Sequence, residues 1–475
     1  MNPSIPLCVD MDGTLLKTDT LLELLFGVLK QKPWVLLLLP LWCLRGKVFL
    51  KRTLSARYSL NVALLPINVD FVDFLHAEKT NGRELYLATG AYLDLAQQVA
   101  AHYGVFSGVL ATSDKNLTGR TKAEAMVAQF GEKGFDYAGN STVDSPCWEH
   151  ARQCYLVNAS PAVVKKMVAL FSFEKMFDLR SKITLAILLR ALRIHQWAKN
   201  ILVFIPLLAS HKALEFSLLQ NTLLAFLAFG CSASLSYVIN DIGDLDADRQ
   251  HRSKHKRPFA CGELSIPNGL TLVLLLAACA IFLVSFLPLR FASALLAYLV
   301  ITNLYSMRLK NFPVLDVAIL AGLYTLRVVA GGLATGVEVS FWLLAFSGFI
   351  FFSLAIVKRV SELLTIEVSG NQPVQCRGYW TSDIPVLTGL GTASAMMAVL
   401  VLALYINSPN VVALYSSPRY LWVLCPVMAL WLGRVWLITG RGDMHDDPVV
   451  FALRDRMSWL LFLLAGSFIV VGANI

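Results

Sequence analysis

The sequence predicts two domains of different fold class: an N-terminal α/β domain, and an all-α membrane domain of about nine transmembrane helices. The chain has 475 residues, of which 56% are hydrophobic and 15% are charged, whereas soluble domains usually carry about 25% charged residues. The charge is unevenly distributed, because long apolar runs alternate with short polar loops from about residue 185 onward. We therefore assign residues 1–165 to the first domain, 166–184 to a linker and 185–475 to the membrane domain.

Charge and cysteine content restrict the partners. The net charge of +9 could indicate nucleic acid, but in so apolar a chain it indicates cytoplasmic loops and anionic lipid, so we expect no nucleic-acid partner. The nine cysteines contain no CxxC pair, so neither a zinc site nor a disulfide framework is predicted. The start MNPSIPLCVDMDGT lacks the features of a signal peptide, so we expect the N-terminal domain to stay in the cytoplasm.

The stretch IPLCVDMDGT predicts a buried strand whose end carries Asp10 and Asp12. Two carboxylates at i and i+2 on an extended chain point the same way. Such a pair can share a divalent ion while one carboxylate attacks phosphorus. Taken alone, the stretch is also compatible with an ordinary Asp-Gly turn.

Three further stretches place polar residues where strands end or a helix begins. ELYLATGA predicts a strand that ends in Thr89 and Gly90, where a hydroxyl and backbone amides can hold a phosphate. TGRTKAEAM places Lys122 at the start of a helix, as a cation for the phosphate and the nucleophile. FDYAGNSTVD predicts a strand followed by Asn140 and Asp144, whose oxygens suit Mg²⁺.

These four motifs, in this order, resemble the haloacid dehalogenase superfamily over roughly residues 5–160, most closely its phosphoserine-phosphatase-like branch. The resemblance implies a Rossmann-like fold and a Mg²⁺-dependent phosphatase. It implies that Asp10 is the nucleophile and that Asp12 is the general acid and base. Where the superfamily usually has Asp, this chain has Asn140, which offers an oxygen but no charge. The implied metal ligands are Asp10, Asp12, Asn140 and Asp144, and the implied phosphoryl-binding residues are Thr89 and Lys122.

The segment KQKPWVLLLLPLWCLRGKVFLKR lies between the first two motifs, in the position of the superfamily's helical cap. Its apolar part, residues 34–44, is too short to span a bilayer, which needs about 20 residues. It predicts either the core of a cap packed on the phosphatase or an interfacial helix on the membrane. Trp34 and Trp42 bracket the leucines and basic residues flank them, which favours the interfacial helix.

The apolar runs of the second domain predict nine transmembrane helices. Lys and Arg concentrate in the loops and helix ends predicted to face the cytoplasm, in agreement with the positive-inside rule. We therefore predict a multi-pass protein of the inner (cytoplasmic) membrane, with the phosphatase domain and both active sites on the cytoplasmic side and the C-terminus outside. The predicted spans are 190–209, 217–239, 268–287, 291–307, 314–335, 341–360, 384–406, 418–437 and 456–474.

The segment NDIGDLDADRQHRSKHKRP follows the second predicted span and combines acids with bases. Asp241, Asp244 and Asp248 lie at i, i+3 and i+7, so a helix would place them on one face. With the neutral oxygen of Asn240, they suit a Mg²⁺ ion that binds a diphosphate. Asp246 falls off this face. The bases that can contact phosphate directly are His251, Lys254, Lys256 and Arg257.

This segment resembles the first signature of the UbiA superfamily of intramembrane prenyltransferases, and the resemblance covers essentially residues 185–475. Most members have a second acidic motif in the loop after helix six, where this chain has Lys358, Arg359 and Glu362. That substitution, and the spacing of His251 and Lys254 before an Arg-Pro pair, are similar to the decaprenyl-phosphate phosphoribosyltransferase branch.

This branch implies a Mg²⁺-dependent transfer of 5-phosphoribose from phosphoribosyl diphosphate to a polyprenyl phosphate. The fused phosphatase would then remove the 5-phosphate. Further residues at the predicted inner face that suit an anionic substrate are Lys199, Asn200, Tyr305 and Arg327.

Three other functions stay open at this point. The first is an aromatic or quinone prenyltransferase with an unrelated phosphatase attached, the second an inactive membrane anchor, and the third a transporter. The absence of the second acidic motif argues against the prenyltransferase. The intact first motif argues against an inactive anchor, and the absence of an evident inverted repeat argues against a transporter. The expected partners are the polyprenyl phosphate, phosphoribosyl diphosphate and membrane lipids, and a homo-oligomer stays open.

Overall fold

The computed structural model describes residues 5–177, 183–251, 253–368, 378–409, 411, 415–444 and 447–474. The chain divides into two compact units. Unit 1 comprises Met1–Leu192 and Tyr237–Val273, and unit 2 comprises Arg193–Ser236 and Leu274–Ile475. The aspartate-rich segment therefore belongs to the same unit as the N-terminal domain.

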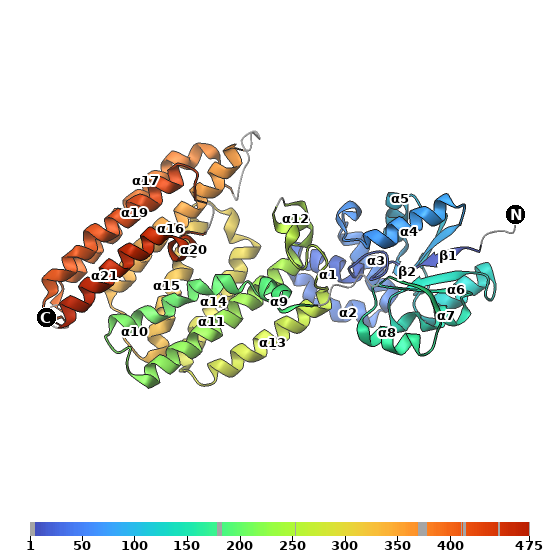
Figure 1. Cartoon of the computed structure of the whole chain (residues 1–475), viewed down its shortest axis with the longest axis horizontal. Coiled ribbons are helices and arrows are strands. Elements are labelled where there is room, and N and C mark those ends of the chain that lie inside the picture. Colours follow the sequence, from blue (N-terminus) through green and yellow to red (C-terminus); the bar gives the residue numbers. More distant parts are fainter. Residues whose placement is uncertain are drawn as a thin grey trace. The chain divides into compact units, whose positions relative to one another are not determined.

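Unit 1 is built on a six-stranded sheet with the strand order β3-β2-β1-β4-β5-β6. Figure 1 labels two neighbouring strands of this sheet, β1 and β2. All five neighbouring pairs are parallel. This is the strand order of a doubly wound Rossmann-like sheet. The α/β class predicted from the sequence is confirmed. The strands are β1 (Leu7–Val9), β2 (Leu85–Tyr92), β3 (Gly108–Thr112), β4 (Asp136–Gly139), β5 (Cys154–Val157) and β6 (Phe173–Phe177).

Helices cover both faces of this sheet. The helices of unit 1 before residue 193 are α1 (Thr20–Gln31), η1 (Pro33–Leu37), α2 (Leu39–Leu44), α3 (Lys47–Arg57), η2 (Val62–Leu64), α4 (Val69–Thr80), α5 (Leu93–Tyr103), α6 (Arg120–Phe130), η3 (Thr142–Asp144), α7 (Ser145–His150), α8 (Pro161–Val168) and α9 (Leu185–Ala191). Of these, α9 packs away from the sheet, with the segment around Ile242. Successive side chains of a strand point to opposite faces. Leu7 and Val9 thus join one core with residues of α1, α3, α4 and α5, and Cys8 joins another with residues of α6, α7 and α8.

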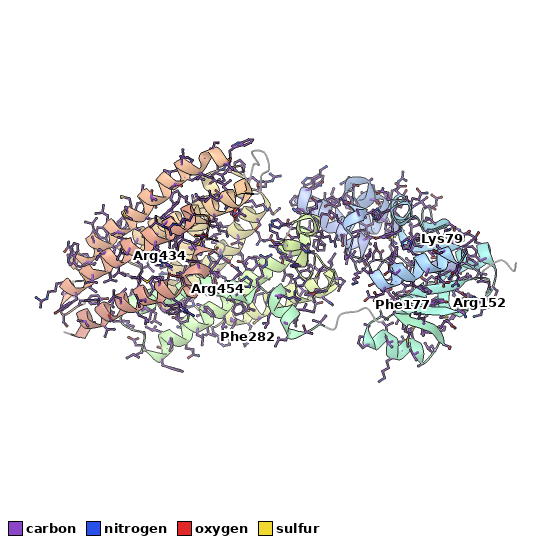
Figure 2. The ribbon with its side chains drawn as sticks, turned by 45° about the horizontal axis from the view of Figure 1, so that its top comes forward. Lys79, Arg152, Phe177, Phe282, Arg434 and Arg454 are labelled. Atoms are coloured by element: carbon purple, nitrogen blue, oxygen red, sulfur yellow. The ribbon has the colours of Figure 1, made fainter. Side chains whose placement is uncertain are left out.

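The sheet extends into residues 166–184, the segment expected to be a linker. β6 lies within it and pairs with β5. Phe177 at the end of β6, which Figure 2 labels, packs against Phe71 and Phe74 of α4. The α/β fold therefore continues at least to Phe177. Residues 178–182 of the expected linker lie outside the described residues.

The expected cap segment forms α1, η1, α2 and α3. Val35 and Trp42 are buried in the core of the unit, whereas Trp34, Leu37 and Leu41 are exposed. One side of the segment packs on the domain, as expected of a cap core. The other side exposes apolar side chains, as expected of an interfacial helix.

The aspartate-rich segment of unit 1 is a helical turn followed by short elements. It begins at the end of α11 and continues through α12 to the start of α13. These elements are α11 (Phe216–Gly243), α12 (Leu245–Gln250), η5 (Lys254–Lys256) and α13 (Ile266–Val284). The first residues of α11 and the last residues of α13 belong to unit 2.

Unit 2 is entirely helical among its described residues. Besides parts of α11 and α13, it contains η4 (Ile194–Phe204), α10 (Ile205–Ala209), α14 (Leu289–Met307), η6 (Leu309–Asn311), α15 (Leu315–Thr335), α16 (Phe341–Val368), η7 (Thr381–Asp383), α17 (Ile384–Ile406), η8 (Pro418–Val423), α19 (Leu424–Gly440), α20 (Pro448–Arg454) and α21 (Arg456–Asn474). Eight helices of the described chain are long and apolar enough to cross a membrane. Many of their large side chains are exposed, including Phe282 of α13, which Figure 2 labels.

The first of the nine predicted spans, 190–209, is not one continuous α-helix. It contains the end of α9, a left-handed residue at Arg193, then η4 and α10. A 3₁₀-helix rises about 2.0 Å per residue and an α-helix about 1.5 Å, so η4 and α10 together extend roughly 30 Å, the thickness of a hydrocarbon core. A ninth crossing is therefore compatible with this geometry. The side of the membrane on which the C-terminus lies stays a prediction.

Close helix packing in unit 2 relies on small residues. A Cβ added at Gly331 of α15 would lie 2.0 Å from the backbone oxygen of Val203 in η4. A Cβ added at Gly391 of α17 would lie 2.1 Å from the ring of Trp436 in α19. Small residues allow membrane helices to approach closely where apolar burial alone gives little driving force.

Candidate functional site

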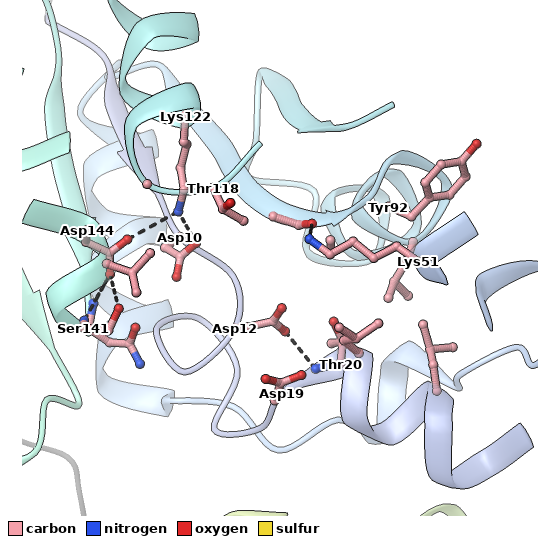
Figure 3. A pocket seen from close by; sticks show the side chains of 18 residues that line it. Asp10, Asp12, Asp19, Thr20, Lys51, Tyr92, Thr118, Lys122, Ser141 and Asp144 are labelled. Carbon is pink, nitrogen blue, oxygen red and sulfur yellow. Dashed lines mark hydrogen bonds and ion pairs between the residues drawn. The ribbon is translucent and has the colours of Figure 1, made fainter. Parts of the chain in front are cut away.

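The phosphatase-like site of unit 1 is a cavity of about 280 Å³ at the carboxyl end of the sheet (Figure 3). Ligands of doubly wound sheets bind at this edge, beside the strand where the order reverses. The cavity is lined by Asp10, Asp12, Asp19, Thr20, Leu21, Leu24, Lys51, Gly90, Ala91, Tyr92, Leu95, Thr118, Gly119, Lys122, Asn140, Ser141, Val143 and Asp144. Residues of all four motifs predicted from the sequence thus line one cavity, although Thr89 itself does not.

A buried lysine is shared by two carboxylates in this cavity. Lys122 Nζ lies 2.7 Å from Asp10 Oδ1 and 3.4 Å from Asp144 Oδ1, and donates to the hydroxyl of Tyr137. The two acids raise the pKa of Lys122 although burial acts against them. Burial raises the pKa of Asp10 to about 6, and Lys122 opposes this rise. The lysine therefore stays charged beside the expected nucleophile.

Asp144 differs from its expected role as a metal ligand. Its Oδ2 accepts hydrogen bonds from the backbone of Asn140 and from Ser141, and its Oδ1 accepts one from Tyr137. With Lys122 beside Oδ1, both oxygens are already engaged by the protein. This arrangement supports Asp144 as a residue that positions Lys122 and the loop after β4. Asp10, Asp12 and Asn140 are the expected oxygen ligands that still fit Mg²⁺, which keeps several waters when bound.

Asp12 is tied to the beginning of α1. Its Oδ1 accepts a hydrogen bond of 3.0 Å from the backbone amide of Thr20, and Asp19 caps the same helix. Burial, and then the nearby charge of Asp19, raise the pKa of Asp12 to about 7. A carboxyl group with a pKa near neutrality can both give and take a proton, as a general acid and base must.

The expected phosphate-binding residues of β2 have different surroundings. Thr89 is fully buried, and its hydroxyl accepts a hydrogen bond from the amide of Ala91. Gly90 lines the cavity, and its carbonyl oxygen accepts hydrogen bonds from Lys51 Nζ at 2.5 Å and from Thr112. Thr89 therefore holds the backbone of β2 where its pairing with β3 is irregular, and its expected direct contact with phosphate is not supported by this geometry.

Lys51 of α3 is a cavity residue that the sequence analysis did not identify. Besides Gly90, its Nζ donates to Asn116 Oδ1 at 2.7 Å, and burial lowers its pKa. It supplies a second cation on the opposite side of the cavity from Lys122 (Figure 3). The signal in the sequence was weak, because Lys51 stands within a run of basic residues.

In the aspartate-rich segment, two of the three aligned acids share one cation. Arg257 Nη1 lies 3.2 Å from Asp241 Oδ1 and 2.5 Å from Asp248 Oδ2. Both acids are buried, with 3% of their surface exposed. Asp244 points elsewhere and forms an ion pair with Lys30 of α1. Arg257, expected to bind phosphate, therefore also holds the two buried carboxylates together.

The remaining residues of this segment divide between the N-terminal domain and solvent. Asp246 accepts a hydrogen bond of 2.5 Å from the hydroxyl of Tyr58. Arg249 forms an ion pair with Glu23 of α1. His251 is exposed, and Lys254 is partly exposed in η5. Burial and then Lys254 lower the pKa of His251. Asn240 lies near the end of α11, before Asp241.

The acids of this segment suit a Mg²⁺ ion that is completed by substrate and water. Within the described residues, no three His, Cys, Asp or Glu side chains converge as a site built wholly by protein would require. Mg²⁺ is usually bound by one or two carboxylates together with substrate phosphates and water. The buried pair of Asp241 and Asp248 matches that requirement.

In unit 2, Arg359 is enclosed by protein groups. Its side chain is fully buried, with Nη2 2.7 Å from Asp316 Oδ2, and it also pairs with Glu362. Nη2 is within 3.4 Å of the hydroxyl of Tyr305. Direct contact of Arg359 with substrate is therefore not supported by this geometry. The side chain of Glu362 is partly exposed, and its role as a substrate-binding residue stays a prediction. Tyr379 adds a hydrogen bond of 2.5 Å to Asp316.

Lys358, by contrast, is partly exposed and takes part in a second cluster. Its Nζ lies 3.3 Å from Asp447 Oδ2, and Lys199 Nζ lies 2.7 Å from the same oxygen. Asp447 stands before α20, outside the membrane-spanning helices, and caps it through the amide of Val449. Burial raises its pKa, but Lys199 and then Lys358 outweigh burial, so that the pKa of Asp447 lies below its usual range. Asp447 was not identified from the sequence.

Arg327 lies beside this cluster and is buried, as its position within a span suggested. It donates to Asn200 Oδ1 at 3.0 Å and to the hydroxyl of Tyr298 at 3.0 Å. Its guanidinium also lies over the rings of Tyr298 and Tyr324. Arg327 therefore orients Asn200, whose buried Nδ2 has no hydrogen-bond partner within the described part of the chain. That amide donor, next to Lys199, suits an anionic ligand.

Comparison with known proteins finds similarity over the membrane helices and over the whole chain. The UbiA prenyltransferase family matches residues 201–470. The uncharacterized protein y4nM of Sinorhizobium fredii is 37% identical over 476 residues, covering 98% of this chain and 91% of its own. A decaprenyl-phosphate phosphoribosyltransferase of Mycolicibacterium smegmatis is 29% identical over 284 residues, covering 58% of this chain and 89% of its own. The structure of a UbiA homolog from Archaeoglobus fulgidus bound to DMAPP and Mg²⁺ is 21% identical, covers 60% of this chain and 96% of its own, and has a TM-score of 0.45.

The family match begins after the parallel sheet and continues through the helices of unit 2. It includes both the aspartate-rich segment and the segment around Lys358 and Arg359. The resemblance to the UbiA superfamily inferred from these motifs is confirmed. Since the match covers more than half of the sequence, the chain belongs to the UbiA prenyltransferase family.

Proposed function

We propose that this chain transfers 5-phosphoribose from phosphoribosyl diphosphate to a polyprenyl phosphate, and that its N-terminal domain then removes the 5-phosphate. The observation that carries the proposal is the cluster of Lys199 and Lys358 around Asp447. Two cations at this position suit a substrate phosphate, whereas a second metal site for a prenyl diphosphate would need acids. The similarity to a decaprenyl-phosphate phosphoribosyltransferase supports the same donor.

In the transfer step, a phosphate oxygen of the polyprenyl phosphate attacks C1 of the ribose. The bond from C1 to the diphosphate oxygen breaks, and inorganic diphosphate leaves. Asp241 and Asp248 would hold Mg²⁺, which when bound supplies positive charge to the diphosphate and assists its departure. Arg257, released from part of its pairing with these acids, contacts a diphosphate oxygen. Lys199 and Lys358 supply positive charge, and the Asn200 amide a further donor, for a phosphate group of the substrates.

In the phosphatase step, Asp10 attacks the phosphorus of the 5-phosphate. The bond from phosphorus to the ribose oxygen breaks, and Asp12 gives its proton to that oxygen. Water then attacks the aspartyl phosphate while Asp12 takes up a proton, and inorganic phosphate leaves. Lys122, held by Asp144 and Tyr137, stabilises the negative charge of the transferring phosphoryl group. Mg²⁺ would be held by Asp10, Asp12 and the oxygen of Asn140. The product is a polyprenyl-phosphoryl ribose.

The experiment supplies purified full-length protein with polyprenyl phosphate and phosphoribosyl diphosphate that carries one label in the ribose and another in the 5-phosphate. We expect ribose label in the lipid fraction, and 5-phosphate label released as inorganic phosphate. With Asp10→Asn, both labels should stay in the lipid. No ribose label in lipid, together with transfer from a prenyl diphosphate to an aromatic acceptor, would show that the prenyltransferase alternative is correct.

A further inference from the structure

Unit 1 exposes a group of large apolar side chains within residues 34–44. We name it the apolar ridge. Its members, with the fraction of each that is exposed, are Trp34 (56%), Leu36 (60%), Leu37 (79%), Leu41 (57%) and Leu44 (84%). Single exposed apolar residues are normal on a protein surface, but five within eleven consecutive residues indicate a contact with another apolar phase. The opposite side of the same segment, Val35 and Trp42, is buried and fixes the ridge to the domain.

Positive charge surrounds the ridge. Lys32, Arg45, Lys47 and Arg52 are exposed on both sides of it. No Asp or Glu occurs in the sequence between Glu23 and Asp70. Long basic side chains around an apolar face are typical of segments that lie in the headgroup region, where their charges meet lipid phosphates. Each basic residue adds to the attraction when the lipid is anionic.

We infer that the apolar ridge lies in the headgroup region of the membrane that this chain itself crosses, with its basic residues on anionic lipid. The described chain contains eight helices able to span a bilayer, and two of them, α11 and α13, have one end in unit 1. The helices of the ridge, η1 and α2, are far too short to span it, since about 20 residues are needed. The ridge therefore rests on the membrane and does not cross it.

This contact has a consequence for the phosphatase cavity. The ridge joins α1 to α3 along the chain, and these two helices supply Leu21, Leu24 and Lys51 to the cavity wall. A domain seated on lipid through its cap has its cavity close to headgroups. Presentation of a lipid-linked phosphate to Asp10 rests on the proposed function, whereas the lipid contact does not.

Photocrosslinking of the full-length protein tests the contact directly. Leu37 is replaced by p-benzoylphenylalanine, and the protein is illuminated in nanodiscs that contain phosphatidylglycerol. We expect lipid adducts at position 37. A control with the same residue at Thr80, at the exposed end of α4 beside the labelled Lys79 of Figure 2, should give none. Crosslinks from position 37 only to protein, or no crosslinks in correctly folded samples, would overturn the inference.

Charge reversal separates the contact from the chemistry. The triple variant K32E/R45E/K47E should lose about tenfold in phosphatase kcat/KM on a phosphoribosylated lipid in anionic nanodiscs, and keep its activity on soluble p-nitrophenyl phosphate. If the parent protein does not cleave the lipid substrate, the proposed function fails, and crosslinking still decides the contact. If the parent cleaves it and the triple variant is equally active, the role of the ridge in presenting lipid is wrong.

Discussion

Glu23 and Arg249 form a buried bidentate ion pair in unit 1, with Nη1 and Nη2 of the arginine 2.8 and 2.7 Å from the two carboxylate oxygens. Glu23 belongs to α1, whose first amide binds Asp12, and Arg249 belongs to α12, directly after Asp248. Thr18 donates a hydrogen bond of 2.5 Å to the same glutamate. Helix α1 of the phosphatase-like domain thus contacts both Asp12, the expected general acid, and the aspartate-rich segment.

We expect Glu23→Gln to destabilise unit 1 and to weaken transfer. Removal of one partner from a buried ion pair leaves an uncompensated charge, which typically costs about 3–5 kcal/mol. The Mg²⁺ concentration for half-maximal transfer should rise, because α12 carries Asp248. Thermal unfolding and a Mg²⁺ titration measure the two effects. Glu132→Gln, which removes an exposed pair with His150, is the control and should change stability by less than about 1 kcal/mol.

Asp241→Asn should lower transfer by more than about 100-fold and leave hydrolysis of p-nitrophenyl phosphate unchanged. The carboxylate is buried against Arg257 and shares it with Asp248, so a neutral amide removes charge where the diphosphate must be bound. Asp246→Asn is the matched control, since this acid contacts Tyr58 and lies off the shared face. If Asp241→Asn and Asp246→Asn lowered transfer equally, transfer would depend on the fold of the segment and not specifically on the Asp241–Asp248 pair.

Lys358 and Arg359 are adjacent, but their substitution should have different effects. Lys358→Met should lower kcat/KM for phosphoribosyl diphosphate by an amount equivalent to about 2–4 kcal/mol, because it removes a phosphate contact. Arg359→Met should instead lower the melting temperature, because it leaves Asp316 and Glu362 without their shared cation. Steady-state kinetics and thermal unfolding distinguish the two. A purely kinetic effect of Arg359→Met would contradict its assignment as a residue of the helix-bundle core.

Asp10→Asn should abolish phosphate release, by at least about 10³-fold, while transfer continues. The phosphorylated lipid intermediate should accumulate and can be measured by mass spectrometry. Asp94→Asn, at an exposed position of α5, provides the control. Release of phosphate by Asp10→Asn at the rate of the parent would assign the activity to another residue.

Asn140→Asp should lower the Mg²⁺ concentration needed for half-maximal phosphatase activity by about tenfold. The side chain follows β4 at the carboxyl edge of the sheet and lies against Gly13 in the cavity wall. A carboxylate there would add a negative charge to the oxygen ligands, which strengthens binding of a divalent ion. An unchanged Mg²⁺ dependence would place the metal away from this loop.

Local patterns predicted six of the eighteen residues that line the phosphatase-like cavity, among them the expected nucleophile. Asp10, Asp12, Lys122 and Asn140 each follow a strand or begin a helix, and parallel strands bring such positions to one edge of the sheet. The exact role of Asp144 could not be predicted, because its partner Tyr137 belongs to an ordinary buried strand. The role of Lys51 could not be predicted either, because a run of basic residues does not indicate which side chain lines a cavity.

Ion pairs between residues far apart in the chain could not be predicted from the sequence. Lys199 and Asp447 are 248 residues apart, and Glu23 and Arg249 are 226 apart. The KRxxE pattern identified Lys358 and Arg359 together, but only packing decides that one is exposed and the other is enclosed by Asp316. Helical spans were easier to predict, because hydrophobicity and length suffice. The exception is residues 190–209, where the left-handed backbone of Arg193 and the 3₁₀-helix after it interrupt a regular α-helix.

The inclusion of Tyr237–Val273 in unit 1 bears on how this gene can evolve. Leu22 and Phe26 of α1 pack on an apolar cluster that contains Val238, Ile242 and Leu245. Loss of the first 177 residues by deletion would uncover that cluster and strip Arg249 of its carboxylate. Fission into two separately expressed proteins would demand that they reassemble through the same buried surface. Once such a fusion has formed, each half therefore becomes part of the other's folding requirement, and the two catalysts are inherited together.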